Sequence, residues 1–324
     1  MIQSIALLLA VLLVVGLIVV LTTAHLLAEA ILRPPRMTDG KAVYVLKRLS
    51  PGDLGLPFVD ERIQVRDSAH PNGPNIELAA WWIPAPSAST GKCEKCVVFL
   101  HGYADAKVGS IAWAPTWHSL GYNILALDLR AHGESGGRDV TAGFFERHDV
   151  NELLDRLRSI RPDQTRQLVL FGVSMGAAVA LASAALRDDL SAVVIDSPFA
   201  DYRTAVRKHL NRSGMPTGVT ATLAIWFAQL GSGAKFAAVR PLDLLADTPC
   251  PIMMSRGAEE DFITAEESRA LDAAMLHRGY RFADVNWIVP GVGHLGALQA
   301  DPHLYASKIE DFLKAERGEM KKDA

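Results

Sequence analysis

The centre of the chain reads Leu168-Val169-Leu170-Phe171-Gly172-Val173-Ser174-Met175-Gly176-Ala177. Its first four residues form an apolar run typical of a strand buried on both faces, and an Ala-rich helical pattern follows at 175–186. The G-x-S-x-G pattern around Ser174 lies between them. In this strand–turn–helix context it predicts a strained turn that exposes the Ser174 hydroxyl above a sheet as a nucleophile. Gly172 and Gly176 stay small so that strand and helix can approach each other.

Similar apolar runs recur on both sides of this turn, at 97–100, 123–127, 192–195, 252–254 and 285–289. Helical patterns at 145–160 and 303–317 alternate with them. Strand–helix–strand repetition predicts an α/β fold with a doubly wound, mostly parallel sheet. The earlier strands, 62–65 and 76–83, flank the turn signal Asn72-Gly73 and are expected to form an antiparallel edge.

The N-terminal segment is long and apolar, because residues 5–21 carry no charge. With Thr22, Thr23 and Ala24 it reaches about 20 residues, enough to cross a bilayer. A cleaved signal peptide is the alternative, with Ala28-Glu29-Ala30 as a cleavage site, but no Lys or Arg precedes the run. We therefore expect a transmembrane anchor at 1–32, a connector at 33–60, a hydrolytic α/β domain at 61–318 and a tail at 319–324.

The charges next to this segment predict its orientation. Only the α-amine precedes the apolar run, whereas five basic side chains follow it: Arg33, Arg36, Lys41, Lys47 and Arg48. The positive-inside rule then predicts a single-pass protein with its catalytic domain in the cytoplasm.

Composition narrows the class of protein. The net charge is only −3, so the chain lacks the basic composition that is typical of nucleic-acid-binding proteins. Three cysteines, Cys93, Cys96 and Cys250, do not make a disulfide scaffold. The Cys93-Glu94-Lys95-Cys96 spacing is open to two interpretations, a redox or metal site and a pair of turn residues; a redox motif would follow a strand, and this one precedes it.

The segment 199–247 interrupts the strand–helix rhythm with helical pieces and glycines. It follows the carboxyl end of a strand, where α/β sheets bind ligands. We expect a small helical lid, or else an ordinary crossover with irregular loops. Its apolar residues, such as Leu223, Ile225, Trp226 and Phe227, are candidates for contacting an acyl chain.

A base for Ser174 is expected late in the chain. Of ten histidines, only His294 follows an apolar run and a Gly-rich turn, 287–293, which places it on a loop beyond a strand. The oxyanion of an acyl-transfer intermediate needs two preorganised donors. The backbone N–H of Met175 and that of Tyr103, after His101-Gly102, are the candidates, with His101 fixing the loop by packing.

The acid that orients His294 is expected after the strand at 252–254, where Glu259, Glu260 and Asp261 compete. The alternative for each of the three is an exposed carboxylate on a loop with no role in the site.

These motifs resemble the α/β-hydrolase superfamily over nearly all of the chain after the apolar segment. The order of nucleophile, acid and histidine is that of the family. Asp128-Leu129-Arg130-Ala131-His132-Gly133-Glu134-Ser135 resembles its D-x-R-x-H-G-x-S stretch, which is usually structural. The chain looks most like bacterial membrane-anchored esterases, serine aminopeptidase-like hydrolases and the depalmitoylase branch. Laid on the family pattern without a gap, Glu260 takes the acid position, and Asp261 needs a one-residue insertion.

The resemblance implies a serine hydrolase that forms an acyl-enzyme and needs no metal or organic cofactor. The apolar N-terminal segment and the apolar residues of the expected lid favour small-molecule or lipid-like carboxylic esters or thioesters as substrates. A serine peptidase with the same three groups is the alternative. A non-catalytic membrane interaction protein is a third interpretation, which the intact Ser174 and His294 disfavour.

Overall fold

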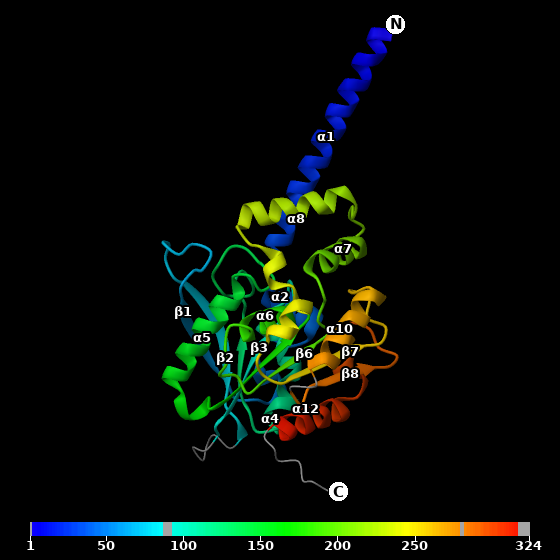
Figure 1. Cartoon of the computed structure of the whole chain (residues 1–324). Coiled ribbons are helices and arrows are strands. Elements are labelled where there is room, and N and C mark those ends of the chain that lie inside the picture. The colour runs from blue at the N-terminus through cyan, green and yellow to red at the C-terminus, as the bar shows by residue number, and fades with distance from the viewer. Residues whose placement is uncertain (1, 87–92, 279–281, 317–324) are drawn as a thin grey trace.

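The computed structural model of the 324-residue chain describes residues 2–86, 93–278 and 282–316 (Figure 1). The expected tail at 319–324 lies outside the described residues.

One eight-stranded sheet has the order β1-β2-β4-β3-β5-β6-β7-β8. Its strands are β1 (Val59–Val65), β2 (Ile76–Ile83), β3 (Lys95–Leu100), β4 (Asn123–Leu127), β5 (Gln167–Val173), β6 (Ala192–Asp196), β7 (Ile252–Gly257) and β8 (Val285–Val289). β2 pairs antiparallel with both β1 and β4, and all other neighbours are parallel. The expected mostly parallel sheet with an antiparallel edge is confirmed.

Helices cover both faces of this sheet (Figure 1). In chain order, the helices of the described residues are α1 (Ile2–Leu32), α2 (Asp39–Leu46), α3 (Lys107–Ser110), α4 (Ala114–Ser119), α5 (Glu146–Ile160), α6 (Met175–Ala184), α7 (Tyr202–Arg212), α8 (Val219–Ser232), α9 (Pro241–Asp247), α10 (Ala265–Arg278), α11 (Ala297–Ala300) and α12 (Pro302–Glu316). Of these, α1 projects away from the domain and α8 runs across α1 (Figure 1). Short 3-10 turns span Pro51–Leu54, Ile111–Trp113, Pro162–Gln164 and Phe236–Val239. α2 lies inside the segment expected to be an irregular connector, where the sequence shows no clear period.

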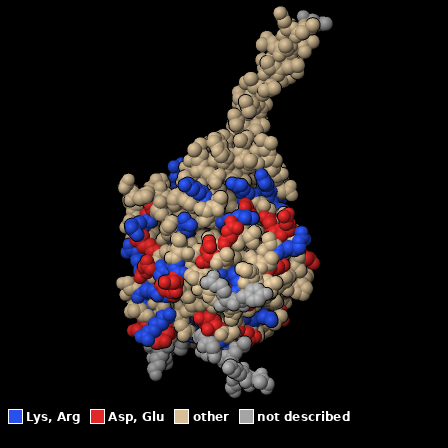
Figure 2. Space-filling view, viewed as in Figure 1, with Lys and Arg blue, Asp and Glu red and all other residues tan. Residues whose placement is uncertain are grey.

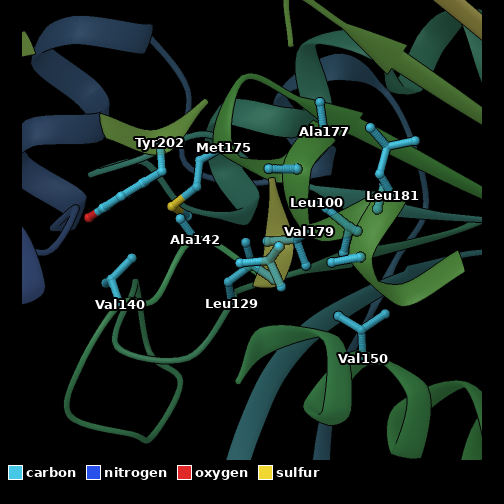
Figure 3. Close-up of a cluster of buried hydrophobic side chains, with 14 of the residues drawn as sticks. Leu100, Leu129, Val140, Ala142, Val150, Met175, Ala177, Val179, Leu181 and Tyr202 are labelled. Atoms are coloured by element: carbon cyan, nitrogen blue, oxygen red, sulfur yellow. The ribbon is translucent and has the colours of Figure 1, made fainter. Parts of the chain in front are cut away.

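The strands are apolar throughout because each face of the sheet has its own core. In β3, Val98 and Leu100 belong to a core cluster that also contains residues of α5, α6, α9 and α10, whereas Val97 and Phe99 belong to a second cluster that contains residues of α4 and α12. Successive side chains of a strand point to opposite faces, so a strand covered twice has no polar face. Figure 3 shows part of the first layer, with Ala177, Val179 and Leu181 of α6 among its side chains.

α1 is a single helix with two different environments. Residues 2–19 are exposed along their whole length, and the helix is long and apolar enough to cross a membrane. Its last turns are instead buried in the domain, through Ala24, Leu27, Ala28, Ile31 and Leu32. The Leu32 carbonyl accepts the Val140 N–H at 2.8 Å, which ties the helix end to the domain.

α8 is the partner of these last turns. Ala24 and Ala28 of α1 and Ala221, Ala224 and Ala228 of α8 are all buried. Small residues on both helices allow their backbones to approach closely. The apolar segment is therefore continuous with the core of the domain, a contact that the sequence did not indicate.

Candidate active site

Ser174 occupies the turn between β5 and α6, at the carboxyl end of the strand. Its backbone has φ 52° and ψ −114°, a strained combination for a residue with a side chain. The flanking glycines are required by space: a Cβ on Gly176 would lie 1.9 Å from the Leu100 carbonyl oxygen, and one on Gly172 would lie 2.2 Å from the Gly176 carbonyl oxygen. Such contacts are impossible, so only glycine permits this approach of β5, α6 and β3.

His294 reaches this turn from the loop after β8. Its Nε2 lies 3.0 Å from the Ser174 Oγ, although 120 residues separate them in sequence. Its Nδ1 lies 2.9 Å from the Glu260 Oε2. The imidazole is thus held between a hydroxyl and a carboxylate, and a proton on Nδ1 leaves Nε2 free to accept one from Ser174.

Glu260 and Asp261 differ sharply in their surroundings. The Glu260 side chain is 2% exposed and faces His294, whereas Asp261 is 56% exposed and pairs with Arg212 of α7. Burial alone would raise the pKa of Glu260, but hydrogen bonds from His294 and from the Phe262 N–H outweigh it, so the pKa is lowered. Glu260 therefore stays ionised, as a partner that orients a histidine requires.

The His294 loop rests on residues that the sequence analysis did not single out. The Leu295 N–H donates to the Ser197 Oγ at 3.0 Å, and Ser197 donates to the Asp196 Oδ1 at 3.1 Å. The Tyr305 hydroxyl donates to the Asp196 Oδ2 at 2.9 Å. Burial raises the pKa of Asp196 to about 6. Asp196 is the last residue of β6, the strand beside β5. The order of strands in the sheet would therefore have identified it as a residue near the His294 loop, but the sequence does not give that order.

Tyr103 and Met175 lie beside Ser174 and line the same cavity. In the described part of the chain, no backbone carbonyl accepts the N–H of either residue. Two buried histidines shape the loop that carries Tyr103: the His101 Nε2 accepts the Leu129 N–H at 3.0 Å, and the His132 Nε2 accepts the Ala104 N–H at 3.2 Å. Burial lowers the pKa of both histidines, which keeps them neutral and able to accept.

The cavity in front of Ser174 is mostly apolar. Its lining residues are Ile31, Tyr103, Ser174, Met175, Phe199, Tyr202, Ala205, Val206, His209, Phe262 and His294. None of these described residues is a carboxylate. Ile31 belongs to α1, so the end of the apolar helix forms one wall. Leu223, Ile225, Trp226 and Phe227, which the sequence suggested as acyl contacts, are not among the lining residues, because α8 turns them toward α1, the core or solvent.

The cysteine pair lies at the amino end of β3, whereas Ser174 follows the carboxyl end of the parallel neighbour β5. Cys93 and Cys96 are buried free thiols, and the Cys93 Sγ donates to the Gly121 carbonyl at 3.1 Å. Burial raises the pKa of the Cys96 thiol, which disfavours the reactive thiolate. Within residues 2–86, 93–278 and 282–316, no cluster of His, Cys, Asp or Glu has the arrangement of a metal site.

Comparison with known proteins agrees with this architecture. A family model described as the alpha/beta hydrolase family matches residues 97–308. The chain belongs to the α/β-hydrolase family. YqkD of Bacillus subtilis (strain 168), an uncharacterised protein, is 24% identical to this hydrolase over 220 residues, 67% of this chain and 70% of YqkD.

Solved structures show the same fold. The esterase Pf2001 of Pyrococcus furiosus is 24% identical, with a TM-score of 0.66 over 87% of this hydrolase and 99% of the esterase. An acylaminoacyl peptidase of Pyrococcus horikoshii is 14% identical, with a TM-score of 0.54 over 89% of this hydrolase and 45% of the peptidase. An esterase and a peptidase thus share the fold, and the choice between these reactions has to come from the site itself.

Proposed function

We propose that this hydrolase cleaves carboxylic esters or thioesters by acyl transfer to Ser174. The observation that carries the proposal is the chain of contacts from Ser174 Oγ through His294 to Glu260, with distances of 3.0 and 2.9 Å. Such a chain supplies a nucleophile, a general base and a group that orients the base.

The reaction proceeds in two steps. His294 Nε2 takes the proton of Ser174 as Oγ attacks the carbonyl carbon of the substrate. The backbone N–H groups of Tyr103 and Met175 stabilise the resulting oxyanion. The intermediate collapses when the C–O or C–S bond breaks, and His294 returns its proton to the leaving alcohol or thiol. Water, deprotonated by His294, then attacks the acyl-enzyme. As the bond between the acyl carbon and the Ser174 Oγ breaks, His294 passes that proton to Oγ, which releases the carboxylic acid and regenerates Ser174.

The apolar lining of the cavity favours an acyl chain over a charged amino-acid substrate. Burying an apolar chain there is favourable, at about 0.8 kcal/mol per methylene. An aminopeptidase has to stabilise a free ammonium group, and the described lining offers no carboxylate for it. The cavity therefore supports the ester or thioester interpretation and disfavours a peptidase of this kind.

The test compares three reactions of the full-length protein in detergent or nanodiscs, because a fragment starting at Pro35 would lack Ile31. A fluorophosphonate probe is expected to label wild type at Ser174 and to leave Ser174→Ala unlabelled. p-Nitrophenyl esters and acyl thioesters are expected to be hydrolysed, and aminoacyl-naphthylamides are not. Faster cleavage of the amides would favour the peptidase, and folded wild-type protein that neither reacts with the probe nor cleaves esters would favour a non-catalytic protein.

The same proposal includes location in a membrane through α1, with the catalytic domain in the cytoplasm. The cations after the apolar segment, Arg33 and Arg36 among them, support this orientation. C-terminal fusions to green fluorescent protein and to alkaline phosphatase test it in a bacterial host. Fluorescence without phosphatase activity is expected, and the reverse pattern would contradict the orientation.

A further inference from the structure

α8 carries an apolar stripe that faces away from the hydrolase domain. Val219, Trp226 and Leu230 are 72%, 54% and 68% exposed, and half-buried Leu223 lies between them at helical spacing. The whole helix, VTATLAIWFAQLGS, contains no charged residue. Exposed apolar side chains that are grouped on one face in this way mark candidate surfaces for binding a partner or a membrane.

The exposed part of α1 sets the position of this stripe relative to a bilayer. Residues 2–19 would span about 27 Å at 1.5 Å per residue, close to the roughly 30 Å of a hydrocarbon core. The turns that pack on α8, around Ala24 and Ala28, follow directly. In Figure 1, α8 runs across α1 at the base of its exposed part. When α1 crosses a bilayer, α8 therefore lies at the level of the lipid headgroups.

Positive charge lies just below α8, on α7. This helix contains Arg203, Arg207, Lys208 and Arg212 and no carboxylate. Arg207 donates to the Thr222 Oγ1 of α8 at 3.1 Å, so the two helices adjoin. Figure 2 shows the tan surface around α8 with blue side chains beneath it. Of these cations, only Arg212 forms an ion pair with a carboxylate of the described chain. The others remain available for lipid phosphates.

We infer that α8 and α7 together form a docking surface for an anionic bilayer: the α8 stripe inserts among the headgroups and the α7 cations contact phosphates. α1 and α7 also border the cavity, through Ile31, Ala205, Val206 and His209. The cavity is thereby held at the membrane surface, and the acyl substrate is drawn from the bilayer. This last point rests on the proposed function, whereas the docking itself does not.

A depth measurement on the full-length protein in nanodiscs tests the docking. The three native cysteines are buried, so an introduced cysteine is labelled selectively. A nitroxide at Trp226→Cys is compared with one at Ile160→Cys, which is similarly exposed, at 58%, but ends α5 shortly before the chain enters the amino end of β5. We expect the label at 226 to be accessible to oxygen and shielded from a water-soluble nickel reagent, and the label at 160 to behave as in water.

Two outcomes would overturn the inference. Equal accessibility of the two labels to both reagents would place α8 in water. Shielding of the label at 226 from both reagents, together with inter-label distances that show pairing, would assign the stripe to a second copy of the chain. Reaction of the same variants with a fluorophosphonate separates the two proposals. Ser174 labelling without lipid contact contradicts docking alone, and lipid contact without Ser174 labelling contradicts the hydrolase mechanism alone.

The role of the α7 cations is tested by reversing their charge in the presence of an anionic lipid. In discs with phosphatidylglycerol, the triple variant Arg203→Glu, Arg207→Glu and Lys208→Glu should reduce the oxygen accessibility of the label at 226 about threefold or more. The matched triple variant Arg156→Glu, Lys308→Glu and Lys314→Glu, on α5 and α12, should not change it. Equal effects of both triples, or no effect of the first, would contradict a role for the α7 cations.

Discussion

The phenolic hydroxyl of Tyr103 lies 3.0 Å from the carbonyl oxygen of Ile31, and at the same distance from that of Ala30. The last turn of the apolar helix is therefore hydrogen-bonded to the loop whose N–H is proposed to hold the oxyanion. Ile31 is also a wall of the cavity. A helix that the sequence presents as an anchor is thus part of the candidate active site.

Tyr103→Phe tests this link. Removing the hydroxyl takes a donor from two helix-end carbonyls and should lower the free energy of unfolding by about 1 kcal/mol. Because the loop loses its tie to α1, kcat on a soluble p-nitrophenyl ester should fall roughly tenfold with little change in KM, since one misplaced oxyanion donor is costly. A loss of stability with unchanged kcat would show that the bond is only structural.

Ile31 should influence the choice of acyl chain. Ile31→Ala opens the wall that α1 supplies, so the ratio of kcat/KM for octanoyl to butyryl esters should rise roughly tenfold, as one or two more methylenes are buried. Ile31→Trp should lower the same ratio. The control is Leu26→Ala on the exposed side of α1, where the side chain is 62% exposed. Equal ratios in all four proteins would exclude Ile31 from the acyl site.

Glu260 and Asp261 provide a matched pair of substitutions. Glu260→Gln removes the charge that holds the His294 proton on Nδ1, and kcat near neutral pH should fall by about 10⁴-fold. Asp261→Asn changes an exposed ion pair with Arg212 and should alter kcat less than about twofold. Steady-state kinetics on a soluble ester measure both. The opposite ranking would make Asp261 the orienting acid.

The carboxyl group of Asp105 should make the free energy of unfolding depend on pH. Burial raises the pKa of this carboxyl from the ordinary value of 3.8 to about 6, so between these pH values the folded protein binds more protons than the unfolded chain. The protonated Asp105 carboxyl therefore contributes to the free energy of unfolding at low pH, and this contribution is lost as the pH rises through about 6. Asp105→Asn should therefore be more stable than wild type above pH 6, by about 1–3 kcal/mol, with the difference vanishing toward pH 4. Denaturant unfolding at a series of pH values measures this, and a constant difference would contradict it.

The features that could be predicted from the sequence are those that depend on short local patterns, such as apolar runs and Gly-rich turns. The strands and the turn at Ser174 follow from apolar runs, and the position of His294 follows from its Gly-rich turn after such a run. The two acids differ by one residue, and only coordinates separate buried Glu260 from exposed Asp261. Periodicity shows that Trp226 lies on an apolar stripe but not which way the stripe faces.

The features of the site that could not be predicted from the sequence depend on contacts between residues far apart in the chain. The bond between Leu295 and Ser197 joins residues 98 apart in sequence, and that between Tyr103 and Ile31 joins residues 72 apart. Neither pair has a spacing or composition that marks it. Both depend on how the loops at the carboxyl ends of the strands converge, which is set by the order of strands in the sheet.

Rapid-quench analysis of a p-nitrophenyl ester reaction with the full-length protein tests whether Ser174 carries the acyl group with His294 as its base. We predict a burst of p-nitrophenol of about one equivalent per active chain, with the acyl group mapped by mass spectrometry to Ser174, and no burst with His294→Ala. Turnover of the ester by wild type with no burst and no acyl group on the peptide that contains Ser174 would contradict the account.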